Sequence, residues 1–238
     1  MCFSLEASNF MLALGSISSI WAYYKINWQV GLLLGYFALM QLIHVVGYLT
    51  INDCKNKYNQ LASRLNYIHI CFQPFVVIIG YWGLMLYTKN INRDSRIRLM
   101  YALVITFVIG LFLFFRQFKE FSSNGQKLSK INNKNDCIWC GELCSFAGEK
   151  HINFSLPLLK TDYLIPSLFI HFFGMFIIPL FINKFIAILT VILGVLTLIP
   201  AKMHGIDTSE AGTIWCFTSI IQLLIAIFVA MFYKKKIK

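Results

Sequence analysis

The sequence predicts an all-α membrane protein: a bundle of seven transmembrane helices with a long, cysteine-containing extracytoplasmic loop between the fourth and the fifth. Of its 238 residues, 58% are hydrophobic and 13% are charged, whereas a soluble domain has about 45–50% apolar and about 25% charged residues. The mean hydropathy is +0.67. Apolar runs recur at close to the length of about 20 residues that a helix needs to cross the hydrocarbon core. Soluble, disordered, collagen-like and coiled-coil chains are therefore excluded.

Seven apolar runs define the expected spans, which cover residues 10–24, 28–51, 67–87, 99–115, 164–181, 185–201 and 213–233. The first run is short and rich in serine, but no basic region precedes it as one does in a signal peptide, so we count it as a span. Two polar residues separate the fifth run from the sixth, which predicts a tight helical hairpin. We expect one membrane domain over residues 1–238, with residues 116–163 forming a small cap.

The distribution of lysine and arginine predicts the orientation, because short cytoplasmic connections carry the excess of positive charge. Ten cations fall on the side of the C-terminus: Lys25, Lys89, Arg93, Arg96, Arg98, Lys184, Lys234, Lys235, Lys236 and Lys238. Outside the long loop, four fall on the other side: Lys55, Lys57, Arg64 and Lys202. We expect an extracytoplasmic or lumenal N-terminus and a cytoplasmic C-terminus. The net charge of +11 then reports topology and contact with the bilayer, not nucleic-acid binding.

This topology brings all seven cysteines and all five histidines to the outer side. His44, His69 and His171 lie within spans, on the order of 5–12 Å below the outer boundary at the rise of a helix, and His204 follows the sixth span. Ionisable groups inside a membrane are costly and usually mark functional sites. We therefore treat these four histidines as candidate ligands of a Zn²⁺ ion.

Further polar side chains fall at about the same depth. Gln41, Gln73, Ser219 and Gln222 are the expected lining of a ligand pocket, and Pro74 frees a backbone carbonyl beside them. The competing interpretation is a hydrogen-bond network that only holds the helices together.

The long loop has two parts. Residues 122–136 are rich in Asn, Lys and Ser, and residues 137–159 predict an ordered cap with a hairpin that turns at Gly148. Its Cys137, Cys140 and Cys144, together with Cys54, predict disulfides, since extracytoplasmic cysteines are normally oxidised. A zinc site that adds His151 and a redox-active Cys137–Cys140 pair are the alternatives.

Three carboxylates on the outer side are candidate general bases: Asp53, Glu210 and Glu6. Glu210 stands near His204 and Asp207 in a segment that also fits an ordinary solvated loop with a Ser/Thr–Glu helix start.

The opening Met-Cys-Phe-Ser-Leu-Glu-Ala-Ser resembles a family of uncharacterised multi-pass membrane proteins that begin Met-Cys-(Trp/Phe)-Ser-x-x-Ala-Ser and occur in bacteria, algae and large DNA viruses. The stretches 35–41, 67–74, 137–157 and 209–216 resemble the same family, in which Glu commonly stands at the position of Gln41. The resemblance implies seven spans and no established activity.

Two known classes of seven-span protein are tested by single residues. A retinal protein needs a Schiff-base lysine in the last span, and residues 213–233 contain none. Membrane ceramidases and progestin-receptor-like hydrolases use three histidines, an aspartate and a serine around zinc, but their paired-histidine motif is missing from the last span here. The analogy is one of chemistry only.

We therefore expect a membrane-embedded, metal-assisted enzyme, such as a hydrolase, that acts on a lipid-like substrate at the outer leaflet. Zn²⁺ would activate a water molecule, and one of the three carboxylates would serve as base. The alternatives are a seven-helix receptor or transporter for a small hydrophobic ligand, and a thiol or haem redox protein.

Overall fold

The computed structural model describes residues 4–118, 141–148, 151–158, 167–203 and 208–236. Its long helices are α1 (Leu5–Lys25), α2 (Trp28–Leu49), α3 (Lys57–Tyr87), α4 (Arg93–Phe115), α7 (Lys184–Met203) and α8 (Thr208–Lys236). The short helices α5 (Ser167–Phe172) and α6 (Ile178–Leu180) are joined by a π-helical turn, η2 (Phe173–Ile177), and the 3₁₀ turn η1 (Arg116–Phe118) follows α4. Strands β1 (Cys144–Ala147) and β2 (Ile152–Ser155) pair antiparallel. The predicted predominance of helix is confirmed.

Four helices within the described residues are long and apolar enough to cross a membrane: α2, α3, α4 and the part Ile214–Phe232 of α8. Two shorter apolar helical segments, Ile170–Leu180 and Ala187–Leu196, accompany them. These lengths and compositions are those of an integral membrane protein.

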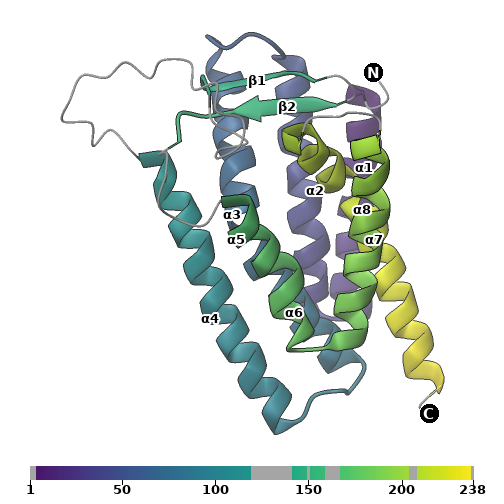
Figure 1. The fold of residues 1–238 in the computed structure, drawn as a ribbon. Helices are drawn as coiled ribbons and strands as arrows, with labels where there is room; N and C mark the ends of the chain where they lie inside the picture. Colours follow the sequence, from purple (N-terminus) through teal and green to yellow (C-terminus); the bar gives the residue numbers. More distant parts are fainter. Residues whose placement is uncertain (1–3, 119–140, 149–150, 159–166, 204–207, 237–238) are drawn as a thin grey trace.

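The helices stand side by side, and the β1–β2 hairpin lies across one end of the bundle (Figure 1). The N-terminus is at the hairpin end and the C-terminus is at the opposite end (Figure 1). Helices α1, α2, α3 and α4 pack in chain order, each against the next, and α7 packs chiefly against α8. The hairpin contacts the hairpin-side ends of α2, α3 and α8.

Helix α3 is longer than hydropathy predicts, since it begins at Lys57 and not at residue 67. The additional turns contain Asn59, Ser63 and Asn66, which hydropathy assigns to a loop but which are buried in the fold. Their burial is explained by the hairpin, whose β1 strand hydrogen-bonds to two of them.

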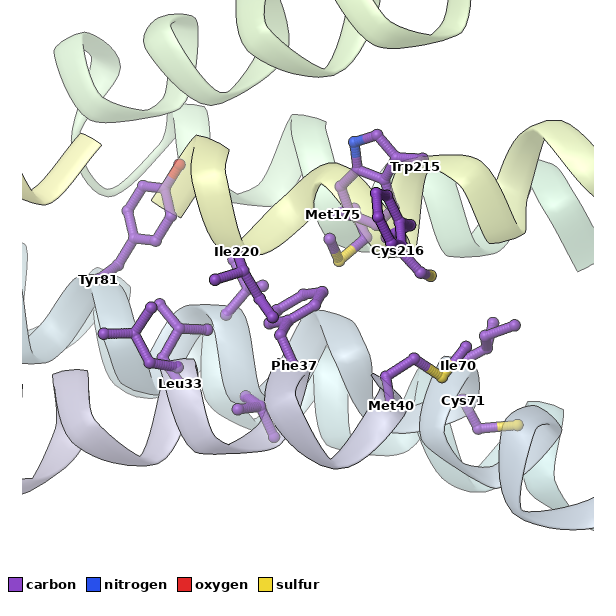
Figure 2. Close-up of a cluster of buried hydrophobic side chains, with 14 of the residues drawn as sticks. Leu33, Phe37, Met40, Ile70, Cys71, Tyr81, Met175, Trp215, Cys216 and Ile220 are labelled. Atoms are coloured by element: carbon purple, nitrogen blue, oxygen red, sulfur yellow. The ribbon is translucent and has the colours of Figure 1, made fainter. Parts of the chain in front are cut away.

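The core between the helices is filled by large apolar side chains and close backbone contacts. Phe37 of α2 points toward Ile220 of α8, with Trp215 and Met175 beside them (Figure 2). Gly80 of α3 lies against Leu33, where an added Cβ would come within 2.3 Å of a Leu33 methyl carbon. Such close approach lets helices gain dispersion energy where the hydrophobic effect contributes little between them.

Two backbone irregularities face each other inside the bundle. Pro74 lies within α3 and has no N–H, so it cannot donate the helical bond to the Ile70 carbonyl, as the sequence predicts. The π-helical turn η2 packs beside it, because a Cβ on Gly174 would lie 2.9 Å from the Pro74 Cβ. π-helical turns occur frequently at functional sites.

Candidate functional site

A group of buried polar side chains lies below the hairpin. We call it the polar centre and define it by Gln41 and His44 on α2, Asn66, His69 and Gln73 on α3, and Cys216 on α8. Each of the six residues is at most 3% exposed. The described buried residues include no carboxylate and no lysine, so the centre is built from groups that donate and accept hydrogen bonds without a fixed charge.

His69 is held against Tyr36 by two reciprocal hydrogen bonds between α3 and α2. The Tyr36 hydroxyl donates to the His69 carbonyl at 2.6 Å, and His69 Nε2 donates to the Tyr36 carbonyl at 2.7 Å. The two rings stack with their centroids 3.9 Å apart. Because a carbonyl only accepts, the ring proton of neutral His69 is on Nε2 and its Nδ1 is an acceptor.

Cys216 collects hydrogen bonds from the two facing helices. The Gln73 amide donates to the Cys216 sulfur at 3.2 Å and to His69 Nδ1 at 3.3 Å. The Gln41 amide donates to the Cys216 carbonyl at 3.2 Å, and Ser219 donates to the same carbonyl at 2.5 Å. These bonds tie α8 to α2 and α3 at one level.

Several polar atoms of the centre have no hydrogen-bond partner within the described structure: Gln41 Oε1, both ring nitrogens of His44, both side-chain polar atoms of Asn66, and Gln73 Oε1. An unsatisfied buried polar group costs about 1–3 kcal/mol. In the antiparallel pair α2–α3, Thr50 meets Asn59 and Tyr36 meets His69. Asn66 therefore lies at a level between these contacts, as Gln41 and His44 do. Such a concentration of unsatisfied groups is a feature of functional sites.

The hairpin is attached firmly above the polar centre. A disulfide joins Cys54, in the turn after α2, to Cys144 at the start of β1. Asn59 donates to the Ser145 carbonyl at 2.8 Å and accepts from the Ser145 amide at 2.8 Å. Ser63 and Ser145 share a further hydrogen bond of 2.8 Å between their hydroxyls.

The hairpin carries His151 to the edge of the polar centre. The His151 ring is fully buried, and its centroid lies 5.0 Å from that of His44. Its Nδ1 shares a hydrogen bond of 2.8 Å with the Tyr48 hydroxyl, which also accepts from the Ile152 amide at 3.1 Å. Burial lowers the pKa of His151 to about 3, so the ring is neutral at physiological pH.

A narrow cavity lies among α2, α3, η2, α7 and α8, and its lining includes Ser219, one helical turn from Cys216. Most of its walls are apolar, with Phe37, Met175 and Trp215 among them. Ser219 and Gln222 also line it, as do Tyr81 and Thr190, whose hydroxyls are 2.8 Å apart. Ser219 therefore belongs both to this cavity and to the hydrogen bonds around Cys216.

The three predicted zinc ligands within the described residues, His44, His69 and His171, do not belong to a group of three or more potential metal ligands. No three His, Cys, Asp or Glu side chains within the described residues lie together as metal ligands. His44, His69 and His171 are all buried, but His69 uses Nε2 on a carbonyl and Nδ1 on Gln73. His204 lies outside the described residues.

The other predicted residues are dispersed. Asp53 and Glu6 are exposed, and the side chain of Glu210 is outside the described part of α8. The disulfide interpretation of the cysteines is confirmed for Cys54 and Cys144, whereas Cys137 and Cys140 lie outside the described residues. Of the expected pocket, Gln41 and Gln73 belong to the polar centre, and Ser219 and Gln222 line the cavity.

Asn66, Tyr36 and Tyr48 are not among the predicted site residues, and the contact of His151 with His44 was not predicted. A signal for Asn66 was present: Asn59, Ser63, Asn66 and Gln73 recur at spacings of three, four and seven, which place them on one face of a helix. No local signal relates residue 44 to residue 151, since their contact depends on how the hairpin docks.

Comparison with known proteins assigns the chain to a protein family. A family model matches residues 6–238, which is nearly the whole chain. The chain belongs to DUF5765, a family of unknown function. This agrees with the expected membership of an uncharacterised family. No curated protein and no solved structure matches the chain.

Proposed function

We propose that this DUF5765 member is a seven-span membrane protein with its hairpin and N-terminus on the extracytoplasmic side. The disulfide between Cys54 and Cys144 supports this orientation, because disulfides persist in oxidising compartments. The opposite end of the bundle is basic, with the exposed residues Lys25, Lys89, Arg93, Arg96 and Arg98. That is the charge distribution of a cytoplasmic face.

The function we propose is binding of a neutral, hydroxyl- or amide-bearing lipid, whose polar end enters the polar centre. The observation that carries this proposal is the set of unsatisfied atoms on Gln41, His44, Asn66 and Gln73. They include both donors and acceptors and no fixed charge, so they complement a headgroup that itself donates and accepts. An anionic headgroup would find no cationic side chain among these residues.

The apolar part of the ligand would lie against a small cavity nearby, which would have to widen to hold it. The cavity at Ser219 is lined mostly by apolar side chains, and it adjoins α7. The face of α7 that carries Ile188, Ile192 and Val195 is exposed, as expected of a helix in contact with lipid. A ligand that places its polar end on Gln41 and Gln73 would extend its chain past Ser219 into this cavity, between α8 and the inner face of α7.

Binding is favoured over the hydrolysis expected from the sequence. Asp53 and Glu6, two of the three expected bases, are exposed, and the polar centre contains no carboxylate. A hydrolase of the expected type needs a base or a metal-bound water beside the scissile bond.

The test is photo-crosslinking in lipid nanodiscs with a diazirine-bearing monoacylglycerol. We expect crosslinks to peptides of α3 or α8, and competition by unlabelled monoacylglycerol but not by phosphatidic acid. Gln41→Leu and Gln73→Leu should each reduce crosslinking at least fivefold. Gln29→Leu is the matched control, since Gln29 is a buried glutamine near the other end of α2.

The proposal fails if Gln41→Leu and Gln73→Leu crosslink like the wild type, or if phosphatidic acid competes equally well. Gel filtration of each variant in detergent, with titration of free thiols to verify the disulfide, separates loss of binding from loss of fold.

A further inference from the structure

Trp215 of α8 carries a buried hydrogen-bond donor that no described group accepts. The residue is 7% exposed, and its indole Nε1 has no hydrogen-bond partner among the described residues. It is the buried one of the described tryptophans, since Trp21, Trp28 and Trp82 are all more exposed. Buried polar atoms are nearly always paired in folded proteins, so an unpaired one indicates a group that the described chain does not supply.

Trp215 lies at the junction of the polar centre and the cavity. It directly precedes Cys216, a member of the polar centre, and it lines the cavity together with Ser219, one helical turn away. The Phe37 ring meets the Trp215 ring edge to face, with centroids 6.2 Å apart, and meets the His69 ring in the same way at 5.9 Å. One aromatic ring therefore connects Trp215 with the polar centre.

The indole nitrogen lies against α7 at a glycine. A Cβ added to Gly194 of α7 would be 3.3 Å from Trp215 Nε1 and 3.3 Å from Phe176 Cε1. Leu193 and Thr190, close to Gly194 on the same helix, line the cavity. The donor is therefore on the side of α8 that faces α7, where the chain of the proposed lipid would pass.

We propose that Trp215 Nε1 donates a hydrogen bond to the carbonyl oxygen of an acyl lipid, so that Trp215 selects acyl lipids over their alkyl-ether analogues. This inference rests on the lipid-binding function proposed above and narrows its ligand. An indole N–H can only donate, so its complement is a group that only accepts. In an acyl lipid that group is the ester or amide carbonyl, which stands between headgroup and chain as Trp215 stands between the polar centre and the cavity. An ether oxygen is a weaker acceptor.

The test compares two competitors that differ only at this group. Full-length protein in nanodiscs of diether phosphatidylcholine, a lipid without carbonyls, is crosslinked with the diazirine-bearing monoacylglycerol. Unlabelled monoacylglycerol and 1-O-alkylglycerol of equal chain length then compete, and N-acylethanolamine is a third competitor. We expect the ether to need about a fivefold higher concentration than the better acyl lipid, since one hydrogen bond is worth on the order of fivefold in affinity. The better of the two acyl lipids identifies the carbonyl as that of an ester or of an amide.

Trp215→Phe keeps an aromatic ring but removes the donor, so acyl and ether lipids should compete equally in this variant. Trp82→Phe is the matched control and should retain the preference, because Trp82 packs in a separate apolar cluster of α3, α4 and α6. NMR of wild-type protein with nitrogen-15-labelled tryptophan is a direct measurement. One of the five indole N–H signals should move downfield with monoacylglycerol and stay in place with 1-O-alkylglycerol.

The inference is overturned if monoacylglycerol crosslinks but the ether competes equally well in the wild type, or if Trp215→Phe keeps the preference. In both cases the lipid-binding proposal stands. If monoacylglycerol does not crosslink at all, both are overturned. The comparison of the two competitors and the NMR measurement need only the wild type, so they decide the matter even if Trp215→Phe does not fold.

Discussion

Asn59 of α3 and Ser145 of β1 are joined by two reciprocal hydrogen bonds, each 2.8 Å long, between the Asn59 amide and the backbone of Ser145. An asparagine side chain thus acts as a short β-strand partner for the hairpin. Asn59 also donates to the Thr50 carbonyl at 2.7 Å, at the end of α2. One buried side chain therefore joins α2, α3 and the hairpin.

We expect Asn59→Ala to lower the free energy of unfolding by about 1–3 kcal/mol, because it removes the partner of the buried Ser145 amide. The carbonyls of Ser145 and Thr50 lose one donor each but keep the backbone amides of Asn52 and Asp53. SDS titration of the protein in mixed micelles measures this change. Asn90→Ala, an exposed asparagine at the opposite end of α3, is the control and should change it little. Equal stability of the two variants would contradict the anchoring role of Asn59.

Reduction of the Cys54–Cys144 disulfide should destabilise the hairpin end. The bond closes a sequence separation of 90 residues, for which the chain-entropy model gives up to about 4.6 kcal/mol. We expect a smaller loss here, because helices in the bilayer already restrict the unfolded chain. The measurement is the rate of proteolysis between β1 and β2 with and without reductant. Cys71→Ser, which alters a buried free thiol, should keep the response to reductant, and Cys54→Ser should abolish it.

The free energy of unfolding should decrease as the pH is lowered, because His151 is held neutral in the folded protein. Its pKa is lowered from 6.5 to about 3 in the folded state by burial. Below pH 6.5 the His151 ring is therefore protonated in the unfolded state, whereas in the folded state it stays neutral down to about pH 3. Across this window His151 lowers the free energy of unfolding by up to about 1.4 kcal/mol per pH unit.

This pH dependence is best measured between pH 6.5 and 5, above the range in which carboxylates titrate. His151→Asn should have a flatter profile than the wild type over this interval. A profile unchanged by the substitution would show that His151 does not remain neutral in the folded protein.

The stack of Tyr36 on His69 yields a graded prediction. Tyr36→Phe removes only the hydroxyl bond to the His69 carbonyl and should lower the free energy of unfolding by about 1 kcal/mol. His69→Ala also removes the stacked ring and the bond to the Tyr36 carbonyl, and should cost about 3 kcal/mol or more. SDS titration measures both, and Tyr101→Phe, on the exposed face of α4, is the control. Equal effects of the two substitutions would show that the ring of His69 contributes little.

The sequence by itself determined the class of protein, the approximate helices and the region of polar chemistry. Apolar runs locate α2 and α4 to within a few residues at most boundaries, since hydropathy reports the burial of a helix in lipid directly. Hydropathy does not predict the first turns of α3, because Asn59, Ser63 and Asn66 are polar residues that are buried by protein and not by lipid. The hairpin turning near Gly148 was predictable from its turn residue and the alternating pattern of the strand that follows.

The tertiary structure alone decided which of the scarce polar side chains meet. The sequence predicts similar depths for His44, His69 and His171, but depth along a helix does not specify the direction in which a side chain points or what it contacts. Rotation of α3 directs His69 onto the Tyr36 carbonyl, and docking of the hairpin brings residue 151 to residue 44 across more than a hundred residues of chain. Composition and periodicity report how far a residue is from water, whereas a site depends on contacts between helices that no local pattern encodes.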